Sequence, residues 1–366
     1  MKPSSLSSAP ARPSHGGNLA WAAALAGCSP TEILDFSASI NPLGAPASVW
    51  QTLQASLADL RHYPDPSYLT LRQALSQYHD LPIEWILPGN GSAELLTWVS
   101  RELAALPQVF LPTPAFGDYF RALKAFNATI VPQLLPDLGK PILPPLAAPG
   151  CQNSAKPQAG CLINNPHNPT GCLFPIDTLR PLLDRFALVV VDEAFMDFLS
   201  PTDQQSLVTA VVDYPNLVIL RSLTKFYSLP GLRLGYAIAH PDRLQRWQSW
   251  RDPWSVNSLA AAAAIACIQD HRFQQITWNW LPPARSQLFD GIAGFEPLQP
   301  YAGQANFLLV RCQTAVSQLQ QDLLMRHRVL IRDCLSFPEL GETYFRVAVR
   351  TETENQRLLD GLADVF

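Results

Sequence analysis

Residues 222–236, SLTKFYSLPGLRLGY, bring two hydroxyl side chains, a lysine and an arginine close together. They follow the apolar run 217–220, LVIL, which is typical of a buried sheet strand. We therefore expect Ser222, Thr224 and Lys225 where a strand ends, with Arg233 shortly behind them. In parallel sheets ligands bind at the carboxyl ends of the strands, so this stretch indicates both an α/β fold and a ligand site.

A second apolar run, 188–191, ends in an acidic residue, Asp192. A lysine amine can form a Schiff base with an aldehyde, while hydroxyl and guanidinium groups bind phosphate. A buried carboxylate keeps a pyridine nitrogen protonated, because the opposite charge favours each ionised form. Lys225, Ser222, Arg233 and Asp192 together indicate a site for pyridoxal 5′-phosphate. Taken alone, Asp192 also fits an acid that caps the next turn.

Short apolar runs recur along the chain with helical patterns between them. Helical periodicity is clear at 93–105 and 176–186. Strands that alternate with helices predict an α/β fold whose sheet is mainly parallel and covered on both faces. The expected strands are 109–111, 128–131, 161–163, 188–191, 217–220 and 235–239.

This alternation ends near Pro241. A helical stretch from 242 to about 280 leads to two further expected strands, 306–311 and 344–349. The proline-rich segment 132–160 is expected to be an irregular excursion. We predict a disordered tail at 1–14, a segment at 15–44 that joins the small domain, a large cofactor-binding domain at 45–240 and a smaller α+β domain at 241–366.

Composition excludes several classes of protein. The chain has 366 residues, 48% of them apolar and 15% charged, with a net charge of −4, so neither disorder nor a nucleic-acid partner is expected. Its longest apolar run, 259–268, is too short to span a membrane. Seven scattered cysteines without a C-x-x-C pair favour reduced thiols and a cytoplasmic location. The histidines lack ligand spacing, so no metal site is expected.

Four further groups of residues are each open to two interpretations. The small residues Gly91, Ser92 and Ala93 open a helix and suit a phosphate, or they form an ordinary N-terminal cap. The loop 164–171, NNPHNPTG, can hold Asn168 near a ring oxygen or be a plain turn. Tyr63 suits either core or surface. Arg346 and Arg350, four residues apart on an expected strand, share a face that suits a dianionic substrate, or they are surface charges.

The order of these motifs resembles the class I/II aminotransferase superfamily, which has pyridoxal-phosphate fold type I. The resemblance covers nearly the whole chain and implies a mainly parallel seven-stranded sheet between helices, with a smaller α+β domain. The residues that carry it are Tyr63, Gly91, Ser92, Ala93, Phe116, Asn168, Asp192, Ser222, Leu223, Thr224, Lys225, Arg233 and Arg346.

The resemblance also implies a role for each matching residue. Lys225 is the expected Schiff-base lysine and proton donor, and Asp192 the partner of the pyridinium nitrogen. Asn168 is expected to bind the ring 3′-oxygen and Phe116 to stack on the ring. The phosphate is expected to be held by Gly91, Ser92, Ser222 and Arg233, helped by Tyr63 from a partner subunit in a homodimer. Ala93 and Thr224 are further expected cofactor contacts. The expected substrate contacts are His15, Asn41, Asn168, Arg346 and Arg350.

Within the superfamily, the chain is most similar to the L-threonine-O-3-phosphate decarboxylases and next to the histidinol-phosphate aminotransferases. The segments 15–18, 35–44, 192–198 and 345–351 carry the finer resemblance, including Phe195, where aminotransferases usually have tyrosine. It implies decarboxylation of L-threonine O-3-phosphate to 1-amino-2-propanol O-2-phosphate, for cobalamin biosynthesis. The alternatives are a histidinol-phosphate aminotransferase that uses 2-oxoglutarate, and a non-catalytic regulator that binds pyridoxal phosphate.

Overall fold

The computed structural model of this chain describes residues 12–146 and 158–366. The predicted tail at 1–11 and the middle of the proline-rich segment, 147–157, lie outside the described residues. The sequence predicts a disordered tail at 1–14 that includes Arg12. In the structure, Arg12 forms an ion pair of 2.7 Å with Asp333. The contacts divide the chain into two compact units: a larger one of residues 40–283 and 302–306, and a smaller one of residues up to 39, 284–301 and 307–366.

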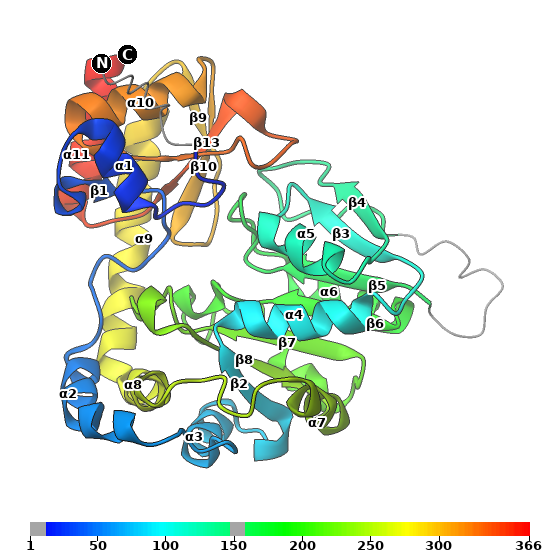
Figure 1. The fold of residues 1–366 in the computed structure, drawn as a ribbon. Helices are drawn as coiled ribbons and strands as arrows, with labels where there is room; N and C mark the ends of the chain where they lie inside the picture. The colour runs from blue at the N-terminus through cyan, green and yellow to red at the C-terminus, as the bar shows by residue number, and fades with distance from the viewer. Residues whose placement is uncertain (1–11, 147–157) are drawn as a thin grey trace, which may run out of the picture. The chain divides into compact units, whose positions relative to one another are not determined.

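The larger unit is built on a seven-stranded sheet with the order β2-β8-β7-β6-β5-β3-β4 (Figure 1). Strand β8 is antiparallel to β2 and β7, and the other neighbours are parallel, which confirms the predicted mainly parallel sheet. The strands are β2 (Ile86–Asn90), β3 (Val109–Thr113), β4 (Ile130–Leu134), β5 (Gly160–Asn164), β6 (Leu188–Asp192), β7 (Leu217–Ser222) and β8 (Leu234–Ala239).

Helices cover this sheet, and Figure 1 shows α4 lying over it beside α5. The α-helices of the larger unit are α2 (Ala47–Ser56), α3 (Leu69–His79), α4 (Ser92–Leu103), α5 (Gly117–Lys124), α6 (Ile176–Arg185), α7 (Pro241–Trp250), α8 (Ser258–Gln269) and the first part of α9 (His271–Ala293). Its short 3₁₀ helices are η2 (Leu57–Arg61), η3 (Ile83–Trp85), η4 (Met196–Phe198), η5 (Val208–Val212) and η6 (Pro230–Leu232).

The two faces of the sheet are set by the alternation of side chains along each strand. Val190, Val218 and Leu220 pack in one core with residues of α4, α5 and α7, and we call this side the α4–α5 face. Their neighbours Val189 and Ile219 are buried on the opposite face. Because the side-chain period of a strand is two, Asp192 and Ser222 point to the α4–α5 face, whereas Arg221 points to the opposite face.

The smaller unit combines an antiparallel sheet with helices. Its four strands have the order β12-β13-β10-β9, and a separate parallel pair joins β1 to β11. The strands are β1 (Leu34–Asp35), β9 (Leu298–Pro300), β10 (Phe307–Cys312), β11 (Val329–Leu330), β12 (Arg332–Asp333) and β13 (Tyr344–Ala348). The helices are α1 (Leu19–Ala26), η1 (Pro30–Glu32), α10 (Val316–His327), η7 (Gly341–Thr343) and α11 (Glu352–Val365), with the end of α9.

Strand β2 is not among the strands expected from the sequence. Proline and glycine are poor strand formers, so the sequence around Pro88 and Gly89 did not indicate a strand. Strand β2 lies at the edge of the sheet, where the missing N–H of a proline leaves no ladder bond unmade.

The domain boundary also differs from the one predicted after residue 240. The expected helical stretch 242–280 is three helices, because Pro253 follows α7, Asn257 caps α8 and Asp270 accepts from the N–H of Phe273 at the start of α9. Helix α8 packs against α2 and α3, so these helices belong to the larger unit. The N-terminal segment joins the smaller unit as far as Ser39 rather than residue 44.

Candidate cofactor site

The predicted lysine lies directly after the end of β7. Ser222 is the last residue of that strand, and its hydroxyl is 2.8 Å from the hydroxyl of Thr224. Lys225 is half-buried, and its Nζ is 5.0 Å from the ring centroid of Phe195. The amine and the two hydroxyls therefore sit at the carboxyl edge of the sheet, as the sequence predicted.

Asp192 ends the neighbouring strand β6 and is buried, with 8% of its surface exposed. The hydroxyl of Tyr119 donates to its Oδ2 at 2.8 Å, and the N–H of Ala194 donates to its Oδ1 at 3.0 Å. Burial raises the pKa of Asp192, while Lys225 and these two donors act in the opposite direction. The carboxylate is thus fixed in orientation beside a cation, as a partner for a pyridinium nitrogen must be.

An anion cradle forms where β8 passes the start of α4. Glycine is needed at positions 91 and 235, because a side chain at either would be too close to its neighbours. A Cβ on Gly91 would lie 2.7 Å from Nη2 of Arg233, and a Cβ on Gly235 would lie 2.5 Å from the amide nitrogen of Ser92. Helix α4 begins at Ser92 and Ala93, with Gly91 at its N-cap and no side chain of the described chain capping it. A free helix N-terminus beside a guanidinium suits a phosphate, so the residues present fit the phosphate of pyridoxal phosphate.

The asparagine loop is tied to the strand that carries Asp192. Asn164 accepts from the N–H of Asn168 at 2.7 Å and donates to the carbonyl of Asp192, also at 2.7 Å. Phe116 is the N-cap residue of α5, half-buried and edge-on to Tyr119, with ring centroids 5.6 Å apart. Asn168 is therefore linked to Asp192 through Asn164, and Phe116 packs on Tyr119, the hydrogen-bond donor to Asp192.

Tyr63 is the most exposed of the predicted cofactor residues. It has 79% of its surface exposed, and its ring lies 4.6 Å from that of Trp254. The core interpretation of Tyr63 is therefore wrong. Its position on the surface is compatible with a contact to a second copy of the chain.

Asn41 does not fit the predicted contact with an anionic substrate. Both hydrogens of its side-chain amide are donated, to the carbonyl of Phe226 and to the hydroxyl of Thr277, each at 2.9 Å. Its own backbone N–H donates to the carbonyl of Lys225 at 3.0 Å. Asn41 thus holds the segment that carries the lysine, and no donor of its side chain remains for an anion.

The predicted arginines belong to the smaller unit and differ from each other. Arg346 lies on β13 and is buried, with 8% of its surface exposed, so it is not a surface charge. Strand β13 ends at Ala348, so the prediction that Arg350 shares this strand is wrong. Arg350 instead forms an ion pair of 2.8 Å with Glu354 in α11, which partly neutralises it.

A second buried arginine, which the sequence analysis missed, lies opposite Arg346. The Cα of Arg332 in β12 is the cross-strand partner of the Cα of Arg346. Burial lowers the pKa of Arg346 to about 10, and the neighbouring Arg332 adds to this effect. Like charges on directly opposite residues disfavour each other, so this pair favours an anionic ligand. His15 is exposed and lines a small hollow with Arg332 and Ser37.

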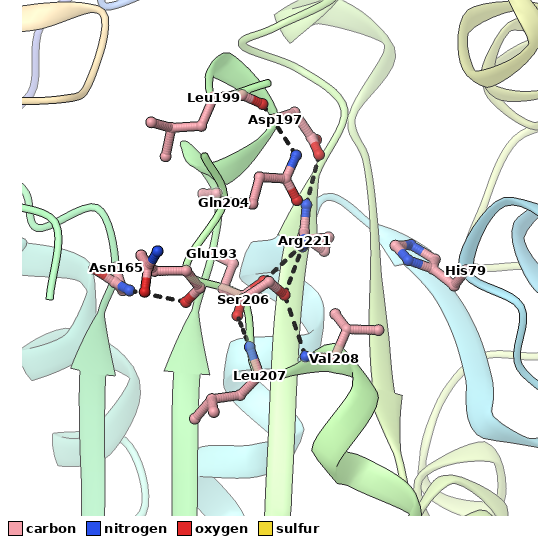
Figure 2. A network of polar contacts seen from close by, with 12 residues as sticks. His79, Asn165, Glu193, Asp197, Leu199, Gln204, Ser206, Leu207, Val208 and Arg221 are labelled. Atoms are coloured by element: carbon pink, nitrogen blue, oxygen red, sulfur yellow. Dashed lines mark hydrogen bonds and ion pairs between the residues drawn. The ribbon is translucent and has the colours of Figure 1, made fainter. Parts of the chain in front are cut away.

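The opposite face of the sheet carries a saturated ionic network. Figure 2 shows Arg221 reaching toward Asp197 on one side and toward Glu193 and Ser206 on the other. Its guanidinium nitrogens lie 2.8 Å from Glu193 and 2.6 Å from Asp197, and all three side chains are nearly fully buried. Burial lowers the pKa of Arg221, but the two carboxylates outweigh that effect and the pKa is raised. We call these three residues the Arg221 triad.

The chain is similar to known proteins over almost its full length. The family model described as aminotransferase class I and II matches residues 31–362. The chain belongs to this family. It is 39% identical to the threonine-phosphate decarboxylase of Salmonella typhimurium, over 96% of each chain. It is 32% identical to the histidinol-phosphate aminotransferase of Symbiobacterium thermophilum, over 90% of each.

A solved structure supports the same fold. The histidinol-phosphate aminotransferase of Clostridium acetobutylicum superposes with a TM-score of 0.80 at 25% identity, covering 91% of this chain and 99% of that one. The predicted fold type I is therefore confirmed. Membership of the family makes the chain a pyridoxal-phosphate enzyme, and pyridoxal phosphate is its cofactor. Among the described residues, no helix is long and apolar enough to cross a membrane.

Proposed function

We propose that this enzyme decarboxylates L-threonine O-3-phosphate to 1-amino-2-propanol O-2-phosphate, a reaction that would serve cobalamin biosynthesis. The observation that carries the proposal is the 39% identity to a threonine-phosphate decarboxylase over nearly the whole chain. Phe195 beside Lys225 adds support, since the resembling decarboxylases tend to have phenylalanine there. A cobalamin-pathway relative from Leptospira interrogans, 29% identical over 97% of this chain, agrees with the pathway, although the chain spans only 41% of that protein.

The roles of the residues follow from their chemistry. When bound, pyridoxal phosphate provides an electron sink for the pair left on Cα as carbon dioxide departs. Asp192 holds the charge on the ring nitrogen, and Arg233 with the N-terminus of α4 binds the phosphate. The Cα–carboxylate bond breaks, and Lys225 Nζ returns a proton to Cα. We propose that Arg332 and Arg346 bind an acidic group of the substrate.

The test is carbon dioxide release from L-threonine O-3-phosphate by the protein loaded with pyridoxal phosphate, without a keto acid. Steady release supports the decarboxylase. The second candidate is a histidinol-phosphate aminotransferase, favoured by the 32% identical relative. No carbon dioxide, with glutamate formed from histidinol phosphate and 2-oxoglutarate, would overturn the proposal in its favour. The regulator alternative lacks such support, because the family is enzymatic and Lys225 and Asp192 are both in place.

The proposed substrate role of Arg346 has its own test. Arg346→Gln should raise KM for the phosphorylated substrate by about tenfold or more, because a charged hydrogen bond is lost. Arg311→Gln, on the exposed side of the neighbouring strand β10, is the matched control and should leave KM unchanged. Equal effects of the two variants would count against the proposal for Arg346.

We further propose a cytoplasmic homodimer in which Tyr63 of one copy contacts the cofactor phosphate of the other. Tyr63 is exposed, and so are Trp50, Leu57 and Leu60 of the nearby α2–η2 segment, which suits an apolar contact between copies. Sedimentation of the full chain should report a dimer. Tyr63→Phe should weaken cofactor binding without changing the assembly, and a monomeric wild-type protein of full activity would contradict the proposal.

A further inference from the structure

Tyr119 is a buried residue of α5 and belongs to none of the motifs named in the sequence analysis. It has 2% of its surface exposed, and its hydroxyl donates to Oδ2 of Asp192 at 2.8 Å. The two residues are 73 positions apart in the chain, so the fold alone brings them together. Phe116, one turn earlier, meets the Tyr119 ring edge-on and limits its movement.

The hydrogen bonds of Asp192 leave part of its carboxylate available. A carboxylate accepts up to about four hydrogen bonds. Among the described residues Asp192 accepts from Tyr119 on one oxygen and from the N–H of Ala194 on the other. Both donors favour the ionised form and fix the plane of the carboxylate, while capacity remains for a further N–H.

We propose that Tyr119 is a positioning residue, which keeps Asp192 ionised and oriented and so sets the lower pH limit of tight cofactor binding. The inference rests on the role proposed for Asp192 above. A protonated carboxyl cannot accept from a pyridinium N–H, so cofactor affinity must fall once Asp192 takes up a proton. Without the Tyr119 hydroxyl this uptake occurs at higher pH.

The surroundings of Asp192 contain few other charges that could produce such a pH dependence. Lys225, after β7, favours the ionised carboxylate, and Asp118 of α5 disfavours it weakly. Behind the sheet, Glu193 and Arg221 belong to the paired Arg221 triad. A proton taken up by Asp118 would favour the ionised form of Asp192, which is the opposite of the predicted trend.

The experiment measures the dissociation constant of pyridoxal phosphate for the full-length apoprotein between pH 5 and 9, by absorbance titration. Tyr119→Phe removes only the hydroxyl. We expect the pH below which affinity falls to rise by about one unit, with about tenfold weaker binding below that point and near wild-type binding at pH 9. Tyr236→Phe, an equally buried tyrosine that bonds His79 on the opposite face, is the matched control and should leave the profile unchanged.

A double-mutant comparison separates the possible failures. In an Asp192→Asn background, Tyr119→Phe should have no effect on the pH profile, since the group it acts through is gone. If Tyr119→Phe lowers only the melting temperature and the profile superimposes on the wild type, Tyr119 is structural and the inference is overturned. If Asp192→Asn itself leaves affinity and profile unchanged, the role of Asp192 fails first, and the inference fails with it.

Discussion

Asp192 and Glu193 are consecutive residues, both acidic and both buried, yet they serve opposite faces of one sheet. Glu193 forms an ion pair with Arg221 and accepts hydrogen bonds from the hydroxyl of Ser206 and the N–H of Leu207, so the chain itself satisfies this carboxylate. Asp192 has two donors among the described residues and a lysine nearby. The α4–α5 face therefore keeps binding capacity for a ligand, whereas the opposite face uses its charges to hold β6 and β7 together.

The turn that follows β6 serves both faces of the sheet. The turn 193–197 begins at Glu193 and ends at Asp197, and Arg221 binds both of these side chains. Phe195, in the middle of this turn, presents its ring to Lys225. The Arg221 triad thus anchors the backbone that carries residues of the α4–α5 face, while its own side chains pair with one another on the opposite face.

The largest expected effect is on the α4–α5 face, at Lys225. Lys225→Ala should lower turnover by at least about 10³-fold, because the amine proposed to bond the cofactor and to return the proton is lost. Thermal stability should change little, since Lys225 lies at the edge of the core. Steady-state assay and a melting curve check both expectations. Lys140→Ala, an exposed lysine, is the control, and an active Lys225→Ala enzyme would contradict the assignment.

The next largest effect is on the opposite face, at Arg221. Arg221→Met should lower the free energy of unfolding by about 3–5 kcal/mol, because two buried carboxylates lose their cation. The control is Arg221→Met combined with Glu193→Gln and Asp197→Asn, which removes all three charges and should recover most of the loss. Urea unfolding measures both. If Arg221→Met alone were as stable as the wild type, the Arg221 triad would not contribute to the stability of the opposite face.

Much of this arrangement could be predicted because its signals are local. Runs such as 188–191 and 217–220 mark buried strands, and the polar residues that follow them in the chain lie at the strand ends in space. The predicted cofactor residues Asp192, Ser222, Thr224 and Lys225 were identified in this way, and they lie at the ends of the neighbouring strands β6 and β7. Asn168 is linked to Asp192 through Asn164, and Arg233 lies beside Gly91.

The missed residues depend on distant contacts. Tyr119 is recognisable only through its bond to Asp192 in another element. Arg332 lies on a two-residue strand, which has no periodicity of its own, and its pairing with Arg346 creates its significance. Asn41 was assigned to the substrate on the family resemblance, whereas its side-chain amide is used within the protein.

A smaller effect concerns pH and His79, which lies on the opposite face and bonds the hydroxyl of Tyr236 at 2.8 Å. Burial lowers the pKa of His79 to about 3, and the nearby Arg221 adds to this. The unfolded chain therefore takes up a proton below pH 6.5 that the folded chain does not, so stability falls as the pH falls. Between pH 7.5 and 5.5 this histidine should cost about 1.4 kcal/mol.

Urea unfolding at both pH values tests this expectation. His79→Gln should lose about 1.4 kcal/mol less than the wild type between pH 7.5 and 5.5. His167 is also buried with its pKa lowered to about 3, and it remains present in both proteins, so it cancels in the difference. Parallel pH dependence in the two proteins would mean that His79 is protonated in the folded state.

The most direct test compares Asp192→Asn with Glu193→Gln, two isosteric changes at adjacent residues. The measurements are the dissociation constant of pyridoxal phosphate and the melting temperature of the apoprotein. We predict that Asp192→Asn weakens cofactor binding by on the order of 10- to 100-fold with little change in melting temperature. Glu193→Gln should instead lower the melting temperature and leave the dissociation constant within about threefold. The reverse pattern, or equal effects of the two changes, would contradict the division of roles between the two faces.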